Sequence, residues 1–278
     1  MGSRGRKTEY ELLELDILLE TIYRISSYDF RQYNRASILR RVYNRMNFDG
    51  IATITRVTEK ILHEQDFLET LLNDFSISVT EMFRNPPFFY ALRREVLPKL
   101  RHLSEIRIWH AGCATGEEVF SMAILLKEEG LIEKSIIYAT DMNEETLEKA
   151  KRGAFPIKRM QDYTKNYILA GGTDAFAEYY RTDSRYAYFH SSLLEKIIFA
   201  QHNLVTDQSF NEFHLILCRN VLIYFTPELQ TKVHALLYES LGKEGFLCLG
   251  DKETLKFEEV VTHYNEFIED ARIYQKIN

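Results

Sequence analysis

The fold is decided by the stretch Ile106-Arg-Ile-Trp-His-Ala-Gly-Cys-Ala-Thr-Gly-Glu-Glu-Val-Phe120 of this 278-residue chain. Its first residues form a short apolar run, which is typical of a buried strand, and Gly112 and Gly116 then bracket a tight turn. From Glu117 onward the apolar residues recur with a helical period. A strand, a glycine turn and a helix in this order build the ligand crevice of an open α/β sheet, at the carboxyl ends of its strands.

The spacing of the two glycines narrows the class of ligand. A dinucleotide site would carry G-x-G-x-x-G and leave the N-terminus of the helix free for a pyrophosphate. Here the spacing is G-x-x-x-G, and Glu117 and Glu118 occupy the first helical turn. Because two carboxylates repel a phosphate and attract a sulfonium or ammonium, the turn favours a cationic nucleoside such as S-adenosylmethionine. The alternative is that both glutamates only complement the helix dipole.

A second strand, from Ser135 to Thr140, ends at Asp141. An acidic side chain that follows the glycine turn at about this distance accepts hydrogen bonds from the ribose hydroxyls of a bound nucleoside. Taken alone, an Asp at the end of a strand is more often an N-cap, and Glu144 and Glu145 open a helix directly after Asp141. The joint occurrence of the turn and the acid favours the nucleoside site.

Composition excludes several classes of protein. The net charge of −6 argues against a basic surface for nucleic acid. The three cysteines, Cys113, Cys218 and Cys248, are far apart and odd in number. They therefore predict neither a disulfide framework nor a metal site, and we expect a cytoplasmic protein. No apolar run approaches the ~18 residues that span a bilayer, so we expect no membrane insertion.

The chain is expected to form two domains. From residue 8 to about residue 92 the periodicity predicts helices only. One of these helices, at about residues 37–46, carries Arg40, Arg41 and Arg45. This arginine cluster is either a solvated charged face or a basic surface for an acidic helical partner.

Residues 93–278 alternate strands and helices, which predicts a doubly wound α/β domain. The alternation is interrupted by two tyrosine-rich stretches, at residues 177–181 and 186–191. Their period of two predicts a small antiparallel β-subdomain inserted at about residues 170–195. Its aromatic side chains either pack within the hairpin or form an edge that docks an extended peptide.

The tetrapeptide Asn85-Pro-Pro-Phe88 resembles a motif of amino-group methyltransferases, in which it follows a buried strand. No apolar strand leads into it here. We therefore interpret Pro86 and Pro87 as the start of a helix, where proline is favoured.

With these residues in view, the chain resembles the CheR-type chemotaxis receptor glutamate methyltransferases along almost its whole length. The matching stretches are, in chain order, Leu39-Arg40-Arg41, Ser78-Val-Thr80-Glu-Met-Phe-Arg84, Cys113-Ala-Thr-Gly-Glu-Glu118, Ala139-Thr-Asp141, His202-Asn203-Leu204 and Cys218-Arg-Asn220-Val-Leu-Ile-Tyr224-Phe. The resemblance implies an all-helical N-terminal domain, a Rossmann-like class I methyltransferase domain and an inserted β-subdomain.

The resemblance also implies a site. Together with the glycine turn, it predicts that S-adenosylmethionine, and its product S-adenosylhomocysteine, are bound by Ser78, Thr80, Arg84, Gly112, Glu118, Asp141, Asn203, Leu204, Arg219 and Asn220. It assigns the orientation of the substrate to Arg84 and Tyr224. Ser78 departs from the family, in which an asparagine is common at this position.

The implied reaction is methyl transfer to glutamate side chains on the cytoplasmic domain of a chemoreceptor. Glutamate is ionised at neutral pH, so no general base is needed, and the sequence shows no Ser-His-Asp arrangement or phosphate loop. The basic helix and, for a receptor tail peptide, the β-subdomain are candidate contacts. Two alternatives are a methyltransferase of the same fold with another acidic acceptor, and a non-catalytic cofactor-sensing adaptor. The presence of both Arg84 and Tyr224 argues against the adaptor.

Overall fold

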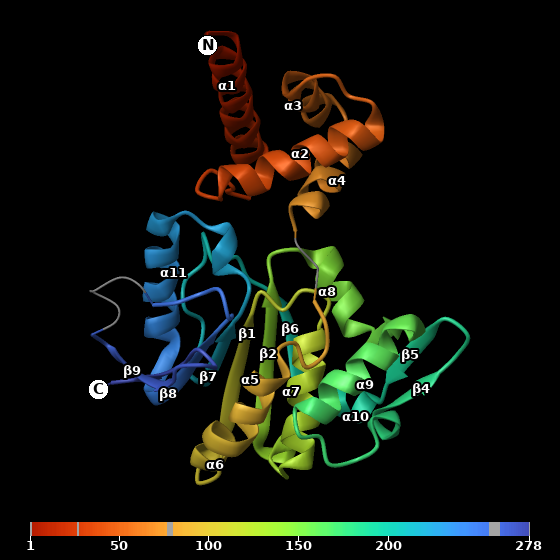
Figure 1. Cartoon of the computed structure of the whole chain (residues 1–278), viewed down its shortest axis with the longest axis vertical. Coiled ribbons are helices and arrows are strands. Elements are labelled where there is room, and N and C mark those ends of the chain that lie inside the picture. Colours follow the sequence, from red (N-terminus) through yellow and green to blue (C-terminus); the bar gives the residue numbers. More distant parts are fainter. Residues whose placement is uncertain (1, 27, 77–79, 256–261, 278) are drawn as a thin grey trace. The chain divides into compact units, whose positions relative to one another are not determined.

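The computed structural model describes residues 2–26, 28–76, 80–255 and 262–277, which form two compact units (Figure 1). The smaller unit comprises Met1–Ile77 together with Tyr224–Gln230, and the larger one comprises Ser78–Ile223 and Thr231–Asn278. None of the described helices combines the length and the apolar character that a membrane span requires.

The smaller unit is helical, as predicted. Its helices are α1 (Gly2–Ile25), α2 (Arg35–Asp49), α3 (Ile54–His63) and α4 (Gln65–Phe75). Two of them begin at residues whose side chains accept a hydrogen bond from the first turn: Asn34 caps α2, and Thr53 caps α3. Helix α2 ends at Gly50, whose φ of +67° is the left-handed conformation that favours glycine.

The larger unit is built on a seven-stranded sheet with the order β6-β2-β1-β7-β8-β10-β9. Its strands are β1 (Ile106–Ala111), β2 (Ser135–Asp141), β6 (Ile197–Gln201), β7 (Phe213–Cys218), β8 (Leu241–Leu249), β9 (Tyr264–Ile268) and β10 (Ile273–Lys276). The first five strands of this order are parallel, and β10 and β9 close the sheet in antiparallel fashion. The sequence pattern at residues 266–269 and 272–277 predicts a closing antiparallel pair, and β9 and β10 confirm it.

The helices of the larger unit precede the first strand or lie between later strands along the chain. They are α5 (Pro86–Ala91), which continues through a π-helical turn (Leu92–Val96) into α6 (Leu97–Leu100), then α7 (Glu117–Glu128), α8 (Glu144–Lys151), α9 (Met160–Leu169), α10 (Ser191–Leu194) and α11 (Pro227–Ser240). Helix α7 is buried from Val119 to Leu126 along its whole circumference, because it packs into the centre of the core. The prediction of a helix start at Pro86 and Pro87 is confirmed.

A second, three-stranded antiparallel sheet has the order β3-β5-β4 and confirms the inserted β-subdomain. Its strands are β3 (Ala154–Pro156), β4 (Tyr180–Thr182) and β5 (Tyr186–Phe189). The hairpin of β4 and β5 lies within the expected residues, but β3 precedes them. A three-residue strand that ends in proline is too short to show a period of two, so the sequence pattern predicted only the hairpin.

In the sequence, the first segment of the smaller unit ends at Ile77 and the larger unit begins at Ser78. The sequence pattern placed the end of the helical domain at about residue 92. Helix α5 accounts for the difference. Its Phe88 and Phe89, and Leu92 after it, are buried in the core of the larger unit. Periodicity identifies such a helix but does not show which core receives its apolar side chains.

The topology fixes where a ligand site can form. The chain places β2 and then β6 on one side of β1, and β7 and β8 on the other. The strand order therefore reverses between β1 and β7, and open α/β sheets bind ligands at such a point, beyond the carboxyl ends of the strands.

Candidate functional site

The glycine turn follows β1 and is held by the neighbouring strand. The N–H groups of Gly112 and Cys113 both donate to the carbonyl oxygen of Thr140, each at 2.8 Å. Gly112 has a φ of +79°, and a Cβ at this residue would lie 2.7 Å from Cγ2 of Val221. Gly116 has a φ of +91°. The fold itself thus requires glycine at both positions, through the backbone conformation and, at Gly112, through the close approach of Val221.

Asp141 ends β2 and faces the same turn. One of its carboxylate oxygens, Oδ2, accepts from the N–H of Ala114 at 2.9 Å, and the other accepts from the N–H of Asn143 at 3.0 Å. Burial raises the pKa of Asp141, and the backbone N–H groups offset only part of this effect. Helix α8 is capped by Asn143 rather than by Asp141. The N–H of Met142 also donates to this carboxylate, so three backbone donors bind Asp141 and one of its roughly four lone-pair sites remains for a further donor.

Glu118 lies in the first turn of α7 and is held from two sides. Its Oε2 accepts from Nη1 of Arg219 at 2.7 Å, and its Oε1 lies 3.2 Å from Nδ1 of His110. The side chains of Arg219 and His110 are each 1% exposed and that of Glu118 is 16% exposed. Burial alone would oppose ionisation, but Arg219 and His110 bring the pKa of Glu118 down to about 2.

Arg219 is positioned in turn by the tetrapeptide Asn85-Pro-Pro-Phe88. Its Nη2 donates to Oδ1 of Asn85 at 3.1 Å. The guanidinium carbon lies 3.7 Å from the ring centroid of Phe88, within the range of a cation–π contact. Sequence reasoning identified this tetrapeptide only as a helix start and missed both contacts. The side chains of Asn85 and Phe88 contact Arg219, which is distant from them in the sequence.

Glu117, the other acid of the turn, does not face a ligand. Its residue is 2% exposed, and its Oε2 accepts from Oγ1 of Thr115 at 2.6 Å. Its Oε1 lies 3.3 Å from the hydroxyl of Tyr163, and burial raises the pKa of Glu117. The expectation that two carboxylates present negative charge to a ligand is therefore wrong for Glu117, because Tyr163 of α9 covers it. At Glu118 the charge is opposed by Arg219.

A further buried acid, Glu253, holds the loop that contains Arg219. Its Oε2 accepts from the N–H groups of Asn220 and Gly250, both at 2.7 Å, and its Oε1 accepts from the N–H of Ile223 at 3.2 Å. Asn220 has a φ of +63°, so the loop after β7 adopts a left-handed turn at this residue. No sequence pattern pointed to Glu253.

The segment before α5 carries three of the predicted cofactor residues. Arg84 is half-buried and lies between Phe83 and Asn85, whose φ angles are +51° and +57°. Left-handed backbone at the residues on both sides of Arg84 stores strain, which is common at functional sites. The backbone oxygen of Thr80 accepts from Nη1 of Arg159 at 3.2 Å. Ser78 lies outside the described residues.

Asn203 and Leu204 follow β6 and complete the set on this side of the sheet. Oδ1 of Asn203 accepts from the N–H of Val205 at 3.0 Å, and Leu204 is buried. The N–H of His202, directly before them, donates to the carbonyl oxygen of Asp141 at 3.1 Å. Hydrogen bonds and chain neighbourhood together link the end of β6, Asp141, the glycine turn, Glu118, Arg219 and Asn85, which directly follows Arg84 in the sequence.

The remaining predicted residues belong to the helical unit. The carbonyl oxygen of Tyr224 accepts from the N–H of Asn34 at 2.7 Å, and the guanidinium of Arg41 lies 5.9 Å from its ring centroid. Arg41 donates from Nη1 to the backbone oxygen of Asp74 at 2.6 Å. Arg45 grips the carboxylate of the same residue through two nitrogens, at 2.5 and 2.9 Å.

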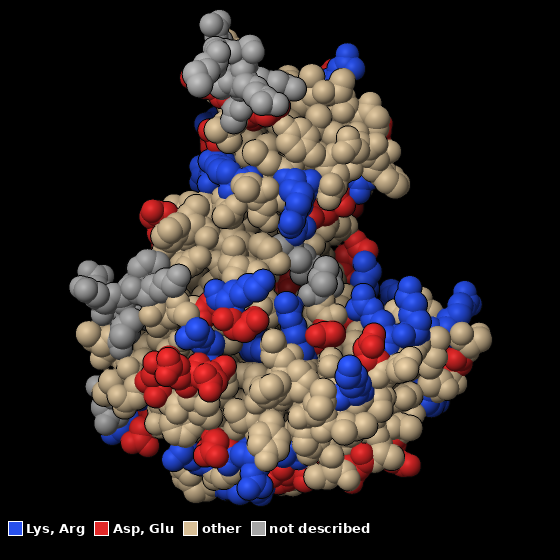
Figure 2. Space-filling model, in the orientation of Figure 1, with Lys and Arg blue, Asp and Glu red and all other residues tan. Residues whose placement is uncertain are grey.

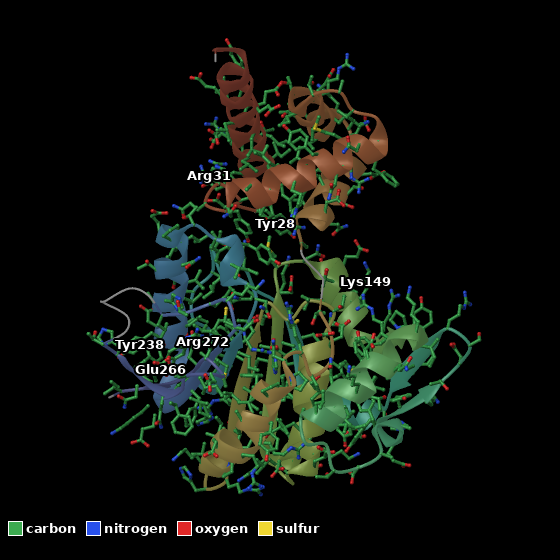
Figure 3. All side chains as sticks on the ribbon, viewed as in Figure 1. Tyr28, Arg31, Lys149, Tyr238, Glu266 and Arg272 are labelled. Atoms are coloured by element: carbon green, nitrogen blue, oxygen red, sulfur yellow. The ribbon has the colours of Figure 1, made fainter. Side chains whose placement is uncertain are left out.

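Two of the three arginines of the cluster, Arg41 and Arg45, therefore bind Asp74 within the helical unit. Arg31, labelled in Figure 3, also pairs with Asp29 and Glu20. Arg40 is exposed on α2. A groove of about 230 Å³ is lined by Arg41, Asn44, Arg45, Phe48 and Asp74. On the face shown in Figure 2, basic and acidic side chains are interspersed over the larger unit rather than gathered into one basic field.

Fold and site together define a class of protein. A doubly wound sheet carries a glycine turn after its first strand, an acid at the end of its second and a buried arginine–glutamate pair beside the turn. This combination is that of a Rossmann-like, nucleoside-binding methyltransferase domain, preceded here by a helical domain.

Comparison with known proteins identifies the family. The model of the CheR methyltransferase SAM-binding domain matches residues 78–269, and that of the CheR methyltransferase all-alpha domain matches residues 13–76. The chain belongs to the CheR methyltransferase family and is a methyltransferase with an S-adenosylmethionine-binding domain.

Two relatives are similar over most of their length. The Cher3 protein of Pseudomonas putida is 46% identical over 264 residues, with 95% of this chain and 97% of that protein covered. The chemotaxis protein methyltransferase of Listeria monocytogenes is 28% identical, with 87% of this chain and 91% of that protein covered. Among solved structures, magnesium protoporphyrin IX methyltransferase from Synechocystis with bound SAH is 16% identical. The superposition covers 59% of this chain and 54% of that enzyme's chain, with a TM-score of 0.34.

Proposed function

We propose that this chain transfers the methyl group of S-adenosylmethionine to glutamate side chains on the cytoplasmic domain of a chemoreceptor, forming glutamate methyl esters. The observation that carries the proposal is the ionised Glu118, held beside the glycine turn by Arg219 and His110. The family membership and the relative named chemotaxis protein methyltransferase support it.

The donors and acceptors at the turn fit the cofactor. The remaining lone pair of Asp141 suits a ribose hydroxyl, and those of Glu118 suit the ammonium of the methionine end. Within the described part of the chain, the buried Nε of Arg219 has no hydrogen-bond partner. A buried donor without a partner is unfavourable, and a carboxylate at the methionine end would satisfy it. Thr80, Gly112, Asn203, Leu204 and Asn220 are the proposed neighbours of the remaining atoms.

When bound, S-adenosylmethionine supplies an electrophilic methyl group on a positively charged sulfur. The acceptor glutamate is already ionised at neutral pH, so the protein has no proton to remove. Its task is to hold the acceptor oxygen in line with the methyl group and to exclude water. We assign to Arg84 the binding of the acceptor carboxylate, because a guanidinium holds a carboxylate in a fixed geometry, and to Tyr224 a second hydrogen bond from its hydroxyl.

The acceptor is an acidic helical protein, and α2 is the proposed contact for it. Arg41 and Arg45 are engaged by Asp74, which leaves Arg40 as the exposed basic side chain of the matching stretch. The edge of the β-subdomain is a further candidate, for a tail peptide of the receptor.

The proposal is tested by incubating the protein with a chemoreceptor cytoplasmic domain and methyl-labelled S-adenosylmethionine. We expect label on the receptor that is released by mild base, as for a methyl ester, and no label once the acceptor glutamates are changed to alanine. Label that survives base would contradict the proposed ester. In the same assay Arg84→Ala should abolish turnover, and a separate calorimetric titration should show that most of the affinity for S-adenosylhomocysteine is retained.

A further inference from the structure

A buried histidine stands beside the site without an assigned role. His110 is the last residue but one of β1, and its residue is 1% exposed. Its Nδ1 lies 3.2 Å from Oε1 of Glu118. Within the described residues its other ring nitrogen, Nε2, has no hydrogen-bond partner although it is buried.

The partner of His110 fixes which ring nitrogen carries the proton. An ionised carboxylate only accepts hydrogen bonds, so Nδ1 must carry the proton and donate it to Glu118. The hydrogen bond that a histidine ring makes decides which of its two nitrogens carries the proton, and here that bond is to Glu118 in the first turn of α7.

Two donors thus hold the two oxygens of Glu118 separately. Arg219 donates to Oε2 from the loop after β7, and His110 donates to Oε1 from within β1. With both oxygens held, the carboxylate plane is set, and the remaining lone pair on each oxygen points in a fixed direction. Without His110, the carboxylate would keep its ion pair with Arg219 but could rotate about it.

We propose that His110 is a positioning residue for cofactor binding: its Nδ1–H fixes the carboxylate of Glu118 so that the remaining lone pairs of that carboxylate meet the ammonium of the methionine end. The inference rests on the proposed function, and it adds a residue that neither the glycine-turn pattern nor the resemblance singled out.

Two substitutions separate this role from simple packing. The side-chain amide nitrogen of asparagine reaches the position of Nδ1, whereas that of glutamine reaches the position of Nε2. Glutamine is nevertheless closer to histidine in volume. A donor role therefore predicts that His110→Asn is tolerated better than His110→Gln, and a packing role predicts the reverse order.

The experiment measures the dissociation constant for S-adenosylhomocysteine by calorimetry, with no acceptor present. We expect His110→Gln and His110→Ala to weaken binding roughly tenfold or more, as for loss of an aligned hydrogen bond between Glu118 and the charged ammonium, and His110→Asn to recover most of it. In the methylation assay, KM for S-adenosylmethionine should rise in the same order, while kcat at saturating cofactor changes little.

A matched control is the variant His214→Gln, on the adjacent strand β7. In the wild type, Nδ1 of His214 accepts from the N–H of Arg107 at 3.0 Å. This contact lies near the start of β1, at the opposite end of the strand from Glu118, so the variant should bind like the wild type. Equal affinities for the three His110 variants, or tighter binding by His110→Gln than by His110→Asn, would overturn the proposal alone. A wild-type protein that binds no S-adenosylhomocysteine would remove the proposed function as well.

Discussion

Asn85 begins helix α5 but does not cap it: its side-chain oxygen accepts instead from Nη2 of Arg219, at 3.1 Å. The backbone explains why this is possible. Asn85 has a φ of +57°, a left-handed conformation that asparagine tolerates better than most residues, and it turns the side chain away from the first helical turn. The start of one helix thereby orients an arginine on a distant loop.

Replacing this asparagine by glycine isolates the contact. Asn85→Gly keeps a residue that adopts the left-handed conformation readily, so the loss of stability should be limited to the lost hydrogen bond, about 1–2 kcal/mol. The affinity for S-adenosylhomocysteine should also fall, because Arg219 is held less firmly in position. Calorimetric titration measures the affinity. Asn85→Ala is the paired control: it removes the same contact and also lowers the unfolding midpoint, since alanine is strained there. An Asn85→Gly protein with wild-type affinity would argue against the contact.

The buried pair of Glu118 and Arg219 predicts a dependence of stability on pH. The pKa of Glu118 is lowered from 4.5 to about 2 on folding. The ionised carboxylate therefore stabilises the folded protein above pH 4.5, and this contribution is lost as the pH falls from 4.5 towards 2. Its size is on the order of 3 kcal/mol by linkage.

Urea unfolding of the wild type and of Glu118→Gln across pH 2 to 5 measures this contribution. The wild type should lose more stability than the variant as the solution is acidified, because glutamine does not titrate. Curves that remain parallel over this range would mean that Glu118 titrates alike in the folded and unfolded chains.

The glycine turn predicts a coupled pair of substitutions. In Gly112→Ala the new Cβ would lie 2.7 Å from Cγ2 of Val221, at a φ of +79°. We expect a loss of about 2–4 kcal/mol in the free energy of unfolding, from overpacking and backbone strain together. Adding Val221→Ala should recover the overpacking part and leave the strain. A double-mutant cycle in chemical denaturation measures the coupling, and strictly additive effects would exclude the clash.

The arginines of α2 are predicted to separate into structural and partner-binding residues. Arg45→Ala should destabilise the protein by roughly 1–3 kcal/mol, because it leaves the carboxylate of Asp74 without its two charge-assisted hydrogen bonds. Arg40→Ala should leave thermal stability unchanged and slow receptor methylation, more so at low salt, where long-range attraction is strongest. Calorimetric scans and initial rates at two salt concentrations test this division, and a destabilised Arg40→Ala protein would contradict it.

The architecture was largely accessible from local patterns. Hydrophobic periodicity predicted the helical unit, the alternation of strands and helices, and the closing antiparallel pair, because each of these is encoded in neighbouring residues. The short strand β3 was missed, since three residues carry no periodic signal. The assignment of α5 to the core of the larger unit was missed because an apolar face does not specify its partner.

The site was only partly accessible. Gly112, Asp141 and Glu118 follow from the pattern of the first two strands. The orientation of the acids does not follow from that pattern. Glu117 and Glu118 are adjacent in the first turn of α7, but Glu117 points to Tyr163 and Glu118 to Arg219. One step along a helix rotates a side chain by about 100°, so the neighbours packed on each face decide the environment.

The sequence by itself determined which elements form, the order in which they follow each other and the chemistry available at the turn, because capping, periodicity and glycine spacing act over a few residues. Only the tertiary structure decided which groups meet. Asn85 reaches Arg219, His110 reaches Glu118, and Glu253 collects the N–H groups of the loop after β7. Such contacts depend on packing between segments that are distant in the sequence. A buried polar group there is costly unless it is hydrogen-bonded, and no local sequence pattern shows which partner it will find.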